Sequence, residues 1–144
     1  MTTFIVPNGN GTSANPVVSI AAGDYYTVAF LADGSVMRWG FDDDRGQFDI
    51  PRGISTNENP VVAMSKGDGH TVALLADGSL ACWGYNEYGQ CNVPSGVGTP
   101  ENPVASVAAG YRHTVALLTD GSVACWGCNA DGQCDVPNAL RESK

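Results

Sequence analysis

Short apolar runs recur along the chain, and turn-forming residues separate them. Many of the runs are rich in β-branched and aliphatic residues, as in YTVAFLA at 26–32 and HTVALLA at 70–76, which is the pattern of buried strands. No long stretch keeps the 3.6-residue spacing of an amphipathic helix between the glycines and prolines. The pattern therefore predicts an all-β protein.

The apolar runs belong to three repeats. Asn-Pro pairs at 15–16, 59–60 and 102–103 lie 44 and then 43 residues apart. Four strands are expected in each repeat, and in the second they are PVVAMSKG at 60–67, HTVALLA at 70–76, SLACWG at 79–84 and GQCNVP at 89–94. We predict a leader at 1–14, repeats at 15–58, 59–101 and 102–137, and a polar tail at 138–144.

An Asp-Gly pair lies between the second and third expected strands of every repeat, at 33–34, 77–78 and 120–121. Asp-Gly between apolar runs is a strong signal for a two-residue hairpin turn in which both turn residues have positive φ. We therefore expect antiparallel hairpins at these three places.

Four antiparallel strands in a unit of about 40–50 residues are typical of a β-propeller blade. Each repeat also has one tryptophan near the end of its third strand, namely Trp39, Trp83 and Trp126. A tryptophan is large enough to fill the space between neighbouring blades. The sequence therefore predicts a β-propeller with three four-stranded blades in the chain.

The repeat resembles that of the regulator of chromosome condensation family. The resemblance is carried by Ala-Gly, His before Thr, Asp-Gly and Trp-Gly in AAGYRHTVALLTDGSVACWG at 108–127, and by Gly-Gln in GQCDVP at 132–137. The repeats are also similar to propeller-type inhibitors of β-lactamase. The resemblance implies a propeller that works by protein contact, in a ring that usually has seven blades.

Three blades cannot close a ring, because propellers typically have four to eight. An open array would leave two apolar blade faces in water, and their burial is comparable with the whole stability of a domain. Two copies would close a six-bladed ring with the two-fold symmetry that is common among oligomers. We expect this homodimer; a homotrimer, a different partner or a longer protein are the alternatives.

A further copy of the fourth strand precedes the first repeat. FIVP at 4–7 ends nine residues before Pro16, as Pro51 and Pro94 precede Pro60 and Pro103. We expect this extra strand to pair with an edge strand of a partner copy, unless it is only a remnant of gene duplication.

The charge and the hydropathy of the chain limit the classes of partner that we expect. The net charge of −8 and the pI of about 4.3 disfavour binding to nucleic-acid phosphates. No apolar run is long enough to cross a bilayer, and the N-terminal residues lack the pattern of a signal peptide. We therefore expect a cytoplasmic protein with neither a nucleic-acid nor a membrane partner.

Two cysteine pairs occupy equivalent repeat positions: Cys82 with Cys91, and Cys125 with Cys134. In the first repeat both positions change together, to Arg38 and Phe48, which indicates that the two positions touch. A disulfide is possible where the geometry allows it, but in a cytosolic protein we expect buried reduced thiols. Cys128 lies in a Cys-x-x-C sequence that lacks the context of a redox or zinc motif.

No catalytic constellation is visible. His70 and His113 share one repeat position, where the first repeat has Tyr26, and no nucleophile is tied to them by spacing. We expect both histidines to be packed structural groups, as is usual for hydrogen-bonded residues at repeat positions. Asp42, Asp43 and Asp44 lack the alternating oxygen ligands of a calcium site, so we expect no metal, no cofactor and no enzymatic activity.

The loops that vary most between repeats lie on one face of the predicted ring. They carry aromatic and charged residues: Tyr25, Phe41, Asp42, Asp43, Asp44, Tyr85, Glu87, Tyr88, Tyr111 and Arg112. Such a mixture on variable loops is typical of a protein-binding face, although ordinary polar loops would look similar. We expect a self-assembling propeller scaffold that binds another protein; a pure self-assembly module, or a regulator of an enzyme or small GTPase, are the alternatives.

Overall fold

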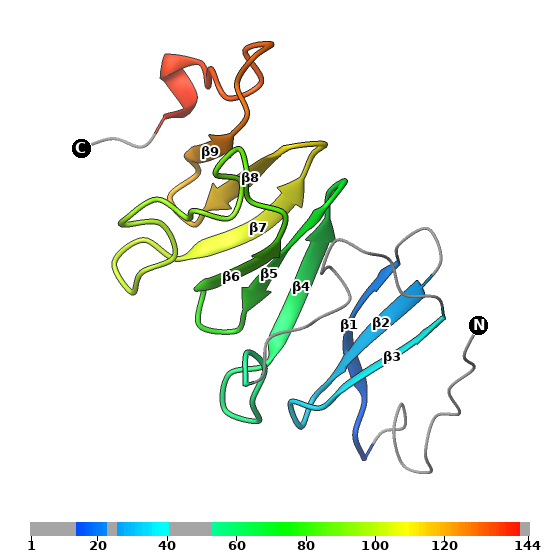
Figure 1. Ribbon diagram of the computed structural model, residues 1–144. Coiled ribbons are helices and arrows are strands. Elements are labelled where there is room, and N and C mark those ends of the chain that lie inside the picture. Colours follow the sequence, from blue (N-terminus) through cyan, green and yellow to red (C-terminus); the bar gives the residue numbers. More distant parts are fainter. Residues whose placement is uncertain (1–13, 23–25, 41–52, 142–144) are drawn as a thin grey trace.

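The computed structural model describes residues 14–22, 26–40 and 53–141. Within these residues nine strands form three antiparallel sheets that follow one another in chain order (Figure 1). The sheets contain β1 (Val17–Ala22), β2 (Tyr26–Leu31) and β3 (Val36–Gly40); β4 (Val61–Lys66), β5 (His70–Leu75) and β6 (Leu80–Gly84); and β7 (Val104–Ala109), β8 (His113–Leu118) and β9 (Val123–Gly127). A short 3-10 helix, η1 (Asn138–Leu140), follows the last sheet. The predicted all-β class is confirmed.

Each sheet is a three-stranded meander, and the three have the same register. In the second sheet Thr71 pairs with Lys66 on one side and with Trp83 on the other. The first strand of every sheet contains a shift of one residue, as between Val61 and Ala63, which is the mark of a β-bulge that bends the strand. The strands β1, β4 and β7 are neighbours, so the sheets stand beside one another as successive blades (Figure 1).

The fourth strand expected in each blade is not a strand in the second and third repeats. Residues 89–94 and 132–137 form a turn followed by extended chain without strand pairing. Gly89 and Gly132 have φ of 75° and 77°, and turn hydrogen bonds close after both, as from the Asn92 amide to the Gly89 carbonyl at 3.0 Å. These turn hydrogen bonds use backbone amide and carbonyl groups that pairing with a neighbouring strand would need. The expected strands at 46–51 and 4–7 lie outside the described residues.

The Asp-Gly turns are present, but the expected backbone conformation was wrong. Only the glycine has positive φ, 88° at Gly78, and no other residue type has positive φ in the described part of the chain. The Gly78 amide donates to the Leu75 carbonyl and the Leu75 amide to the Ser79 carbonyl, both at 2.9 Å. The turn is therefore one residue longer than the expected two-residue turn, and Asp77 keeps the backbone conformation that an L-residue prefers.

The aspartate side chain of each turn closes a second set of hydrogen bonds. Asp77 Oδ1 accepts from the amide and the hydroxyl of Ser79 at 2.9 and 2.6 Å, and the Asp77 amide donates to Asn59 Oδ1 at 2.9 Å. The Ser79 hydroxyl bond first, and the Ser79 amide bond next, lower the pKa of the Asp77 carboxyl. Asp33 and Asp120 accept from their serines in the same way. The repeated Asn of Asn-Pro thus holds the turn of its own repeat.

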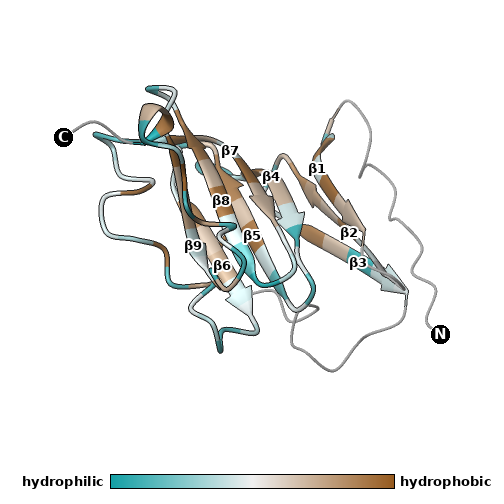
Figure 2. Cartoon of the chain, turned by 90° about the horizontal axis from the view of Figure 1, so that it is seen from above, coloured by the Kyte–Doolittle hydropathy of each residue, from teal (hydrophilic) through white to brown (hydrophobic). Residues whose placement is uncertain are grey.

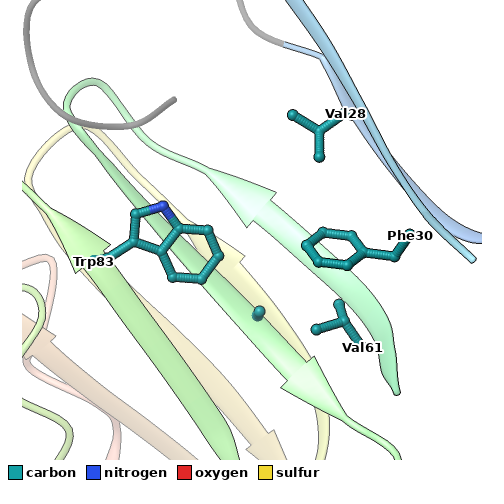
Figure 3. Packing of buried hydrophobic residues seen from close by; sticks show 5 residues of the cluster. Val28, Phe30, Val61 and Trp83 are labelled. Atoms are coloured by element: carbon teal, nitrogen blue, oxygen red, sulfur yellow. The ribbon is translucent and has the colours of Figure 1, made fainter. Parts of the chain in front are cut away.

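The hydrophobic core consists of layers between neighbouring sheets. Val28 and Phe30 of β2 pack against Val61 of β4 and Trp83 of β6, and the four side chains converge between the first and second sheets (Figure 3). A second layer, between the second and third sheets, contains Leu74, Val104, Ala116 and Trp126. Apolar residues concentrate along the strands in Figure 2, and polar residues at their connections. Each tryptophan of these two layers therefore lies between two blades.

Among the described residues no helix is both long and apolar enough to cross a membrane.

Candidate protein-binding face and blade junctions

The loops that follow β6 and β7 bring together five of the residues expected on the binding face. Tyr85, Glu87 and Tyr88 follow β6, and Tyr111 and Arg112 connect β7 to β8. We call these five residues the tyrosine–arginine cluster. Because β6 belongs to the second blade and β7 to the third, the cluster spans two neighbouring blades.

Arg112 is the centre of the cluster. Its Nη1 donates to the Tyr88 hydroxyl at 2.6 Å and its Nη2 to the Tyr111 hydroxyl at 3.2 Å. Its guanidinium carbon also lies over both rings, 4.9 Å from the centroid of Tyr88 and 4.6 Å from that of Tyr111. Cation–π contacts of this kind hold a flexible arginine in one place, so the cluster presents two fixed aromatic rings to solvent.

Tyr85 extends the cluster along the second blade. Its ring centroid lies 6.4 Å from that of Tyr88, and its hydroxyl donates to Glu87 Oε1 at 2.5 Å. The hydrogen bond to the Glu87 carboxylate raises the pKa of Tyr85, because ionisation would remove the donated proton. The other expected members of the face, Tyr25, Phe41, Asp42, Asp43 and Asp44, lie outside the described residues.

A buried hydrogen-bond network joins the second blade to the third, and we call it the blade junction. His70 Nε2 lies 2.9 Å from Thr114 Oγ1. The Thr114 hydroxyl donates to the Gln90 carbonyl at 2.8 Å, and Trp126 Nε1 donates to the same carbonyl at 3.0 Å. Because the Thr114 proton goes to Gln90, Thr114 Oγ1 accepts from His70, and His70 carries its proton on Nε2.

Gly67 makes room for the His70 ring. A Cβ at Gly67 would collide with the carbonyl oxygen of Gly110 and with His70 Cε1. His70 Nδ1 is buried without a hydrogen-bond partner, so its ring has no place for a second proton. Burial lowers the pKa of His70, since the charged imidazolium is poorly solvated there. His70 is neutral and structural at neutral pH.

Sequence reasoning treated the histidines as packed groups but missed their partners. Thr114 and Gln90 both stand in the repeated motifs, as Thr after His and as Gly-Gln, so their recurrence was visible. The pairing was not visible, because His70 of one repeat bonds Thr114 of the next, 44 residues away. His113 has no equivalent neighbour, since the blade that would follow the third repeat is not among the described residues.

The two cysteine pairs lie at equivalent places but differ in state. Cys125 and Cys134 form a disulfide with their Cα atoms 5.1 Å apart, which departs from the reduced thiols that we expected. Cys82 and Cys91 are free thiols. A hydrogen bond between these two thiols, with burial added to it, raises the pKa of Cys82. The same hydrogen bond lowers the pKa of Cys91 and outweighs the opposite effect of burial there. The members of each pair touch, and Cys128 is free.

No group of three or more His, Cys, Asp or Glu side chains within the described ranges is placed to hold a metal ion. His70 is engaged in the blade junction, Asp77 in a turn, and Glu87 in the tyrosine–arginine cluster.

Comparison with known families identifies the repeat. The profile described as "Regulator of chromosome condensation (RCC1) repeat" matches residues 17–47, 61–90 and 104–133. Each matched segment begins at the first strand of a blade and, in the second and third repeats, ends at or next to Gln90 and Gln133. A search of curated protein sequences gives no match.

Solved propellers share the fold. Prp20p from Saccharomyces cerevisiae, described with its binding properties to Gsp1p and histones, aligns with a TM-score of 0.61 and 25% identity over 85% of this chain and 33% of its own. Human WBSCR16 aligns with a TM-score of 0.64 and 24% identity over 83% of this chain and 38% of its own. The C-terminal domain of gp131 from bacteriophage phiKZ aligns with a TM-score of 0.58 and 19% identity, over 90% and 41%. The chain thus spans between 33% and 41% of the length of these structures.

Proposed function

Because the chain belongs to the regulator of chromosome condensation (RCC1) repeat family, we propose that it is a non-enzymatic propeller scaffold that self-assembles into a ring and binds a protein partner through its loop face. The tyrosine–arginine cluster is the observation that carries the binding part of the proposal. Tyr111 is 63% exposed and Tyr88 41% exposed, although Arg112 holds both in place. Fixed, exposed aromatic rings beside an arginine are the residues that dominate protein–protein binding energy.

Structural relatives support the class of function. Prp20p is described with its binding to Gsp1p and histones, and yeast RCC1 (Prp20) has been solved bound to Kap60. These partners belong to those proteins and are not transferred to this chain. For this chain we propose only that a surface of the propeller contacts another protein. Regulation of an enzyme or a small GTPase is the less favoured alternative, because the chain spans only about a third of Prp20p.

The experiment compares affinity enrichment by three proteins from the cells that produce the chain. The wild type is the reference, the Tyr111→Ala/Arg112→Ala variant removes the centre of the cluster, and Glu101→Ala is the control. Glu101 is exposed and precedes β7, whereas Tyr111 follows it, so the two lie at opposite ends of that strand.

We expect a partner that the wild type and the control both retain, and that the double variant loses by about thirtyfold, as for a hot spot worth about 2 kcal/mol. Equal retention by all three proteins would show that the cluster is not the binding site.

A further inference from the structure

The outer face of the third blade exposes residues whose counterparts in the second blade are buried. Leu117 is 41% exposed, whereas its counterpart Leu74 is 6% exposed against the third blade. Gln133 is exposed and His113 half-buried, whereas Gln90 and His70 are fully buried. The second blade uses these positions to contact the third blade. The third blade has the same positions on its outer face, where no described blade covers them.

The outer face of the first blade shows the opposite half of the same interface. Val17 is 42% exposed, while its counterparts Val61 and Val104 are buried in the layers between blades. Ile20, at the position of Met64 and Val107, is 69% exposed. These positions are the ones that a preceding blade would cover.

Hydrogen-bonding groups on the two faces are complementary. At the blade junction the second blade supplies His70 and the Gln90 carbonyl, and the third supplies Thr114 and Trp126. The third blade repeats the first half as His113 and Gln133. The first blade repeats the second half as Thr27 and Trp39, which pair in β2 and β3 as Thr114 and Trp126 pair in β8 and β9.

The geometry on the acceptor side is already in place. Cys125 Sγ lies 3.5 Å from the Gln133 carbonyl oxygen, as Cys82 Sγ lies 3.5 Å from that of Gln90. Gln133 Oε1 accepts from the Asp131 amide at 2.8 Å, as Gln90 Oε1 accepts from the Tyr88 amide at 2.9 Å. The Gln133 loop therefore has the conformation that receives the hydroxyl and the indole at the blade junction.

Resting on the self-assembly part of the proposed function, we propose that the third blade of one copy binds the first blade of a second copy, head to tail. His113 Nε2 donates to Thr27 Oγ1, and the Thr27 hydroxyl and Trp39 Nε1 donate to the Gln133 carbonyl. Leu117 packs against the apolar face that contains Val17 and Ile20. The occupant is a second copy because the chain itself carries both halves of the interface.

Two copies close a ring in this way. The described residues of each copy form three sheets, so two copies joined at both ends give six, which is within the four to eight blades of known propellers. A pairing of two identical faces would place histidine against histidine and leave both threonines and tryptophans without their acceptor. The head-to-tail pairing leaves none of these groups unpaired.

The test blocks one face at a time. Leu117→Arg places a charge on the outer face of the third blade, and Ile20→Arg places one on the outer face of the first. Both side chains are exposed, so circular dichroism should show that each variant still folds. A head-to-tail junction needs one face of each kind, so each variant alone should be a monomer of about 15 kDa by native mass spectrometry. The wild type should be a dimer of twice that mass. An equimolar mixture should form heterodimers, because the two intact faces then meet once.

Thr27→Val tests the hydrogen bonds of the junction without changing its shape, and Thr119→Val makes the same change at an exposed position outside both faces. We expect dimer dissociation to become at least about tenfold easier for Thr27→Val, because each junction loses the two hydrogen bonds of the Thr27 hydroxyl, and to stay unchanged for Thr119→Val. A monomeric wild type overturns both ring self-assembly and the proposed junction. Dimers of either arginine variant alone, a mixture that stays monomeric, or a Thr27→Val dimer as stable as the control overturn the head-to-tail junction but leave self-assembly intact. Loop-face binding is decided separately by the enrichment with the Tyr111/Arg112 variant.

Discussion

At the scale of single residues, the blade junction depends on one histidine that must remain neutral. His70 is fully buried, its Nε2–H is used by Thr114, and its Nδ1 has no partner. A second proton would place an unpaired charge in the interface between two blades. Burial therefore couples the protonation of this side chain to the stability of the fold.

We predict that the free energy of unfolding falls as the pH is lowered from 7.5 to 5.5. Burial lowers the pKa of His70 in the folded state, while the unfolded chain takes up the proton near pH 6.5. The stability is therefore fully present above pH 6.5 and is lost as the pH falls from there toward the folded pKa. Urea unfolding at several pH values measures the change.

His70→Gln is the matched variant, because its amide can still donate to Thr114 but does not titrate. We expect its stability to change little over this pH range, in contrast to the wild type. If the His70 ring titrates at or above pH 6.5 in the folded protein by NMR, the prediction fails even without unfolding data.

At the scale of single elements, each blade relies on a layer of side chains shared with its neighbour. Trp83 is supplied by β6, but its contacts Val28 and Phe30 come from β2 of the preceding blade (Figure 3). A change at this one position therefore loosens two sheets at once.

Trp83→Ala should reduce the free energy of unfolding by about 3–5 kcal/mol, the usual cost of emptying the place of a large core side chain. Tyr111→Ala is the control and should change it by less than about 0.5 kcal/mol, as for an exposed residue. Chemical denaturation of both variants gives the comparison. A harmless Trp83→Ala would mean that the tryptophan does not hold the blades together.

The segment that follows the third strand is fastened differently in the two repeats that show it. A disulfide between Cys125 and Cys134 ties it to β9, whereas the equivalent Cys82 and Cys91 remain thiols. Alkylation of the unreduced protein, followed by intact mass measurement, should therefore add three groups to the five cysteines. Reduction should raise the number to five and lower the stability by about 2–3 kcal/mol, as expected for a short closed loop. Five groups before reduction would show that the pair is reduced, and one would show that both pairs are oxidised.

At the scale of the whole molecule, the sequence predicted the strands of each repeat but not the contacts that join one repeat to the next. Strands such as β5 lie where the apolar runs placed them, because burial dictates those runs locally. Turn geometry was less predictable: Asp77 avoids positive φ by bonding Ser79, and Gly89 begins a turn where a fourth strand was expected. The junction of His70 with Thr114 could not be read from one repeat, because its two halves lie in different repeats.

The candidate binding face shows the same division. The sequence identified Tyr88, Tyr111 and Arg112 as loop residues, but not that the arginine of the third blade holds a tyrosine of the second. That contact depends on how two blades pack, and a single-repeat pattern does not contain that information.

The hydrogen-bond acceptor of the blade junction is a main-chain atom, and this affects how repeat arrays of this kind evolve. The main-chain oxygen of Gln90 accepts hydrogen bonds from the Thr114 hydroxyl, the Trp126 indole and the Cys82 thiol. Every amino acid has such an oxygen, so no amino-acid substitution removes it, whereas one substitution can remove the hydroxyl or the indole that donates to it. Substitutions that break the hydrogen bonds of a blade junction are therefore substitutions of the donor residues. A newly duplicated repeat already has the main-chain acceptor, so selection has to preserve only the donor side chains.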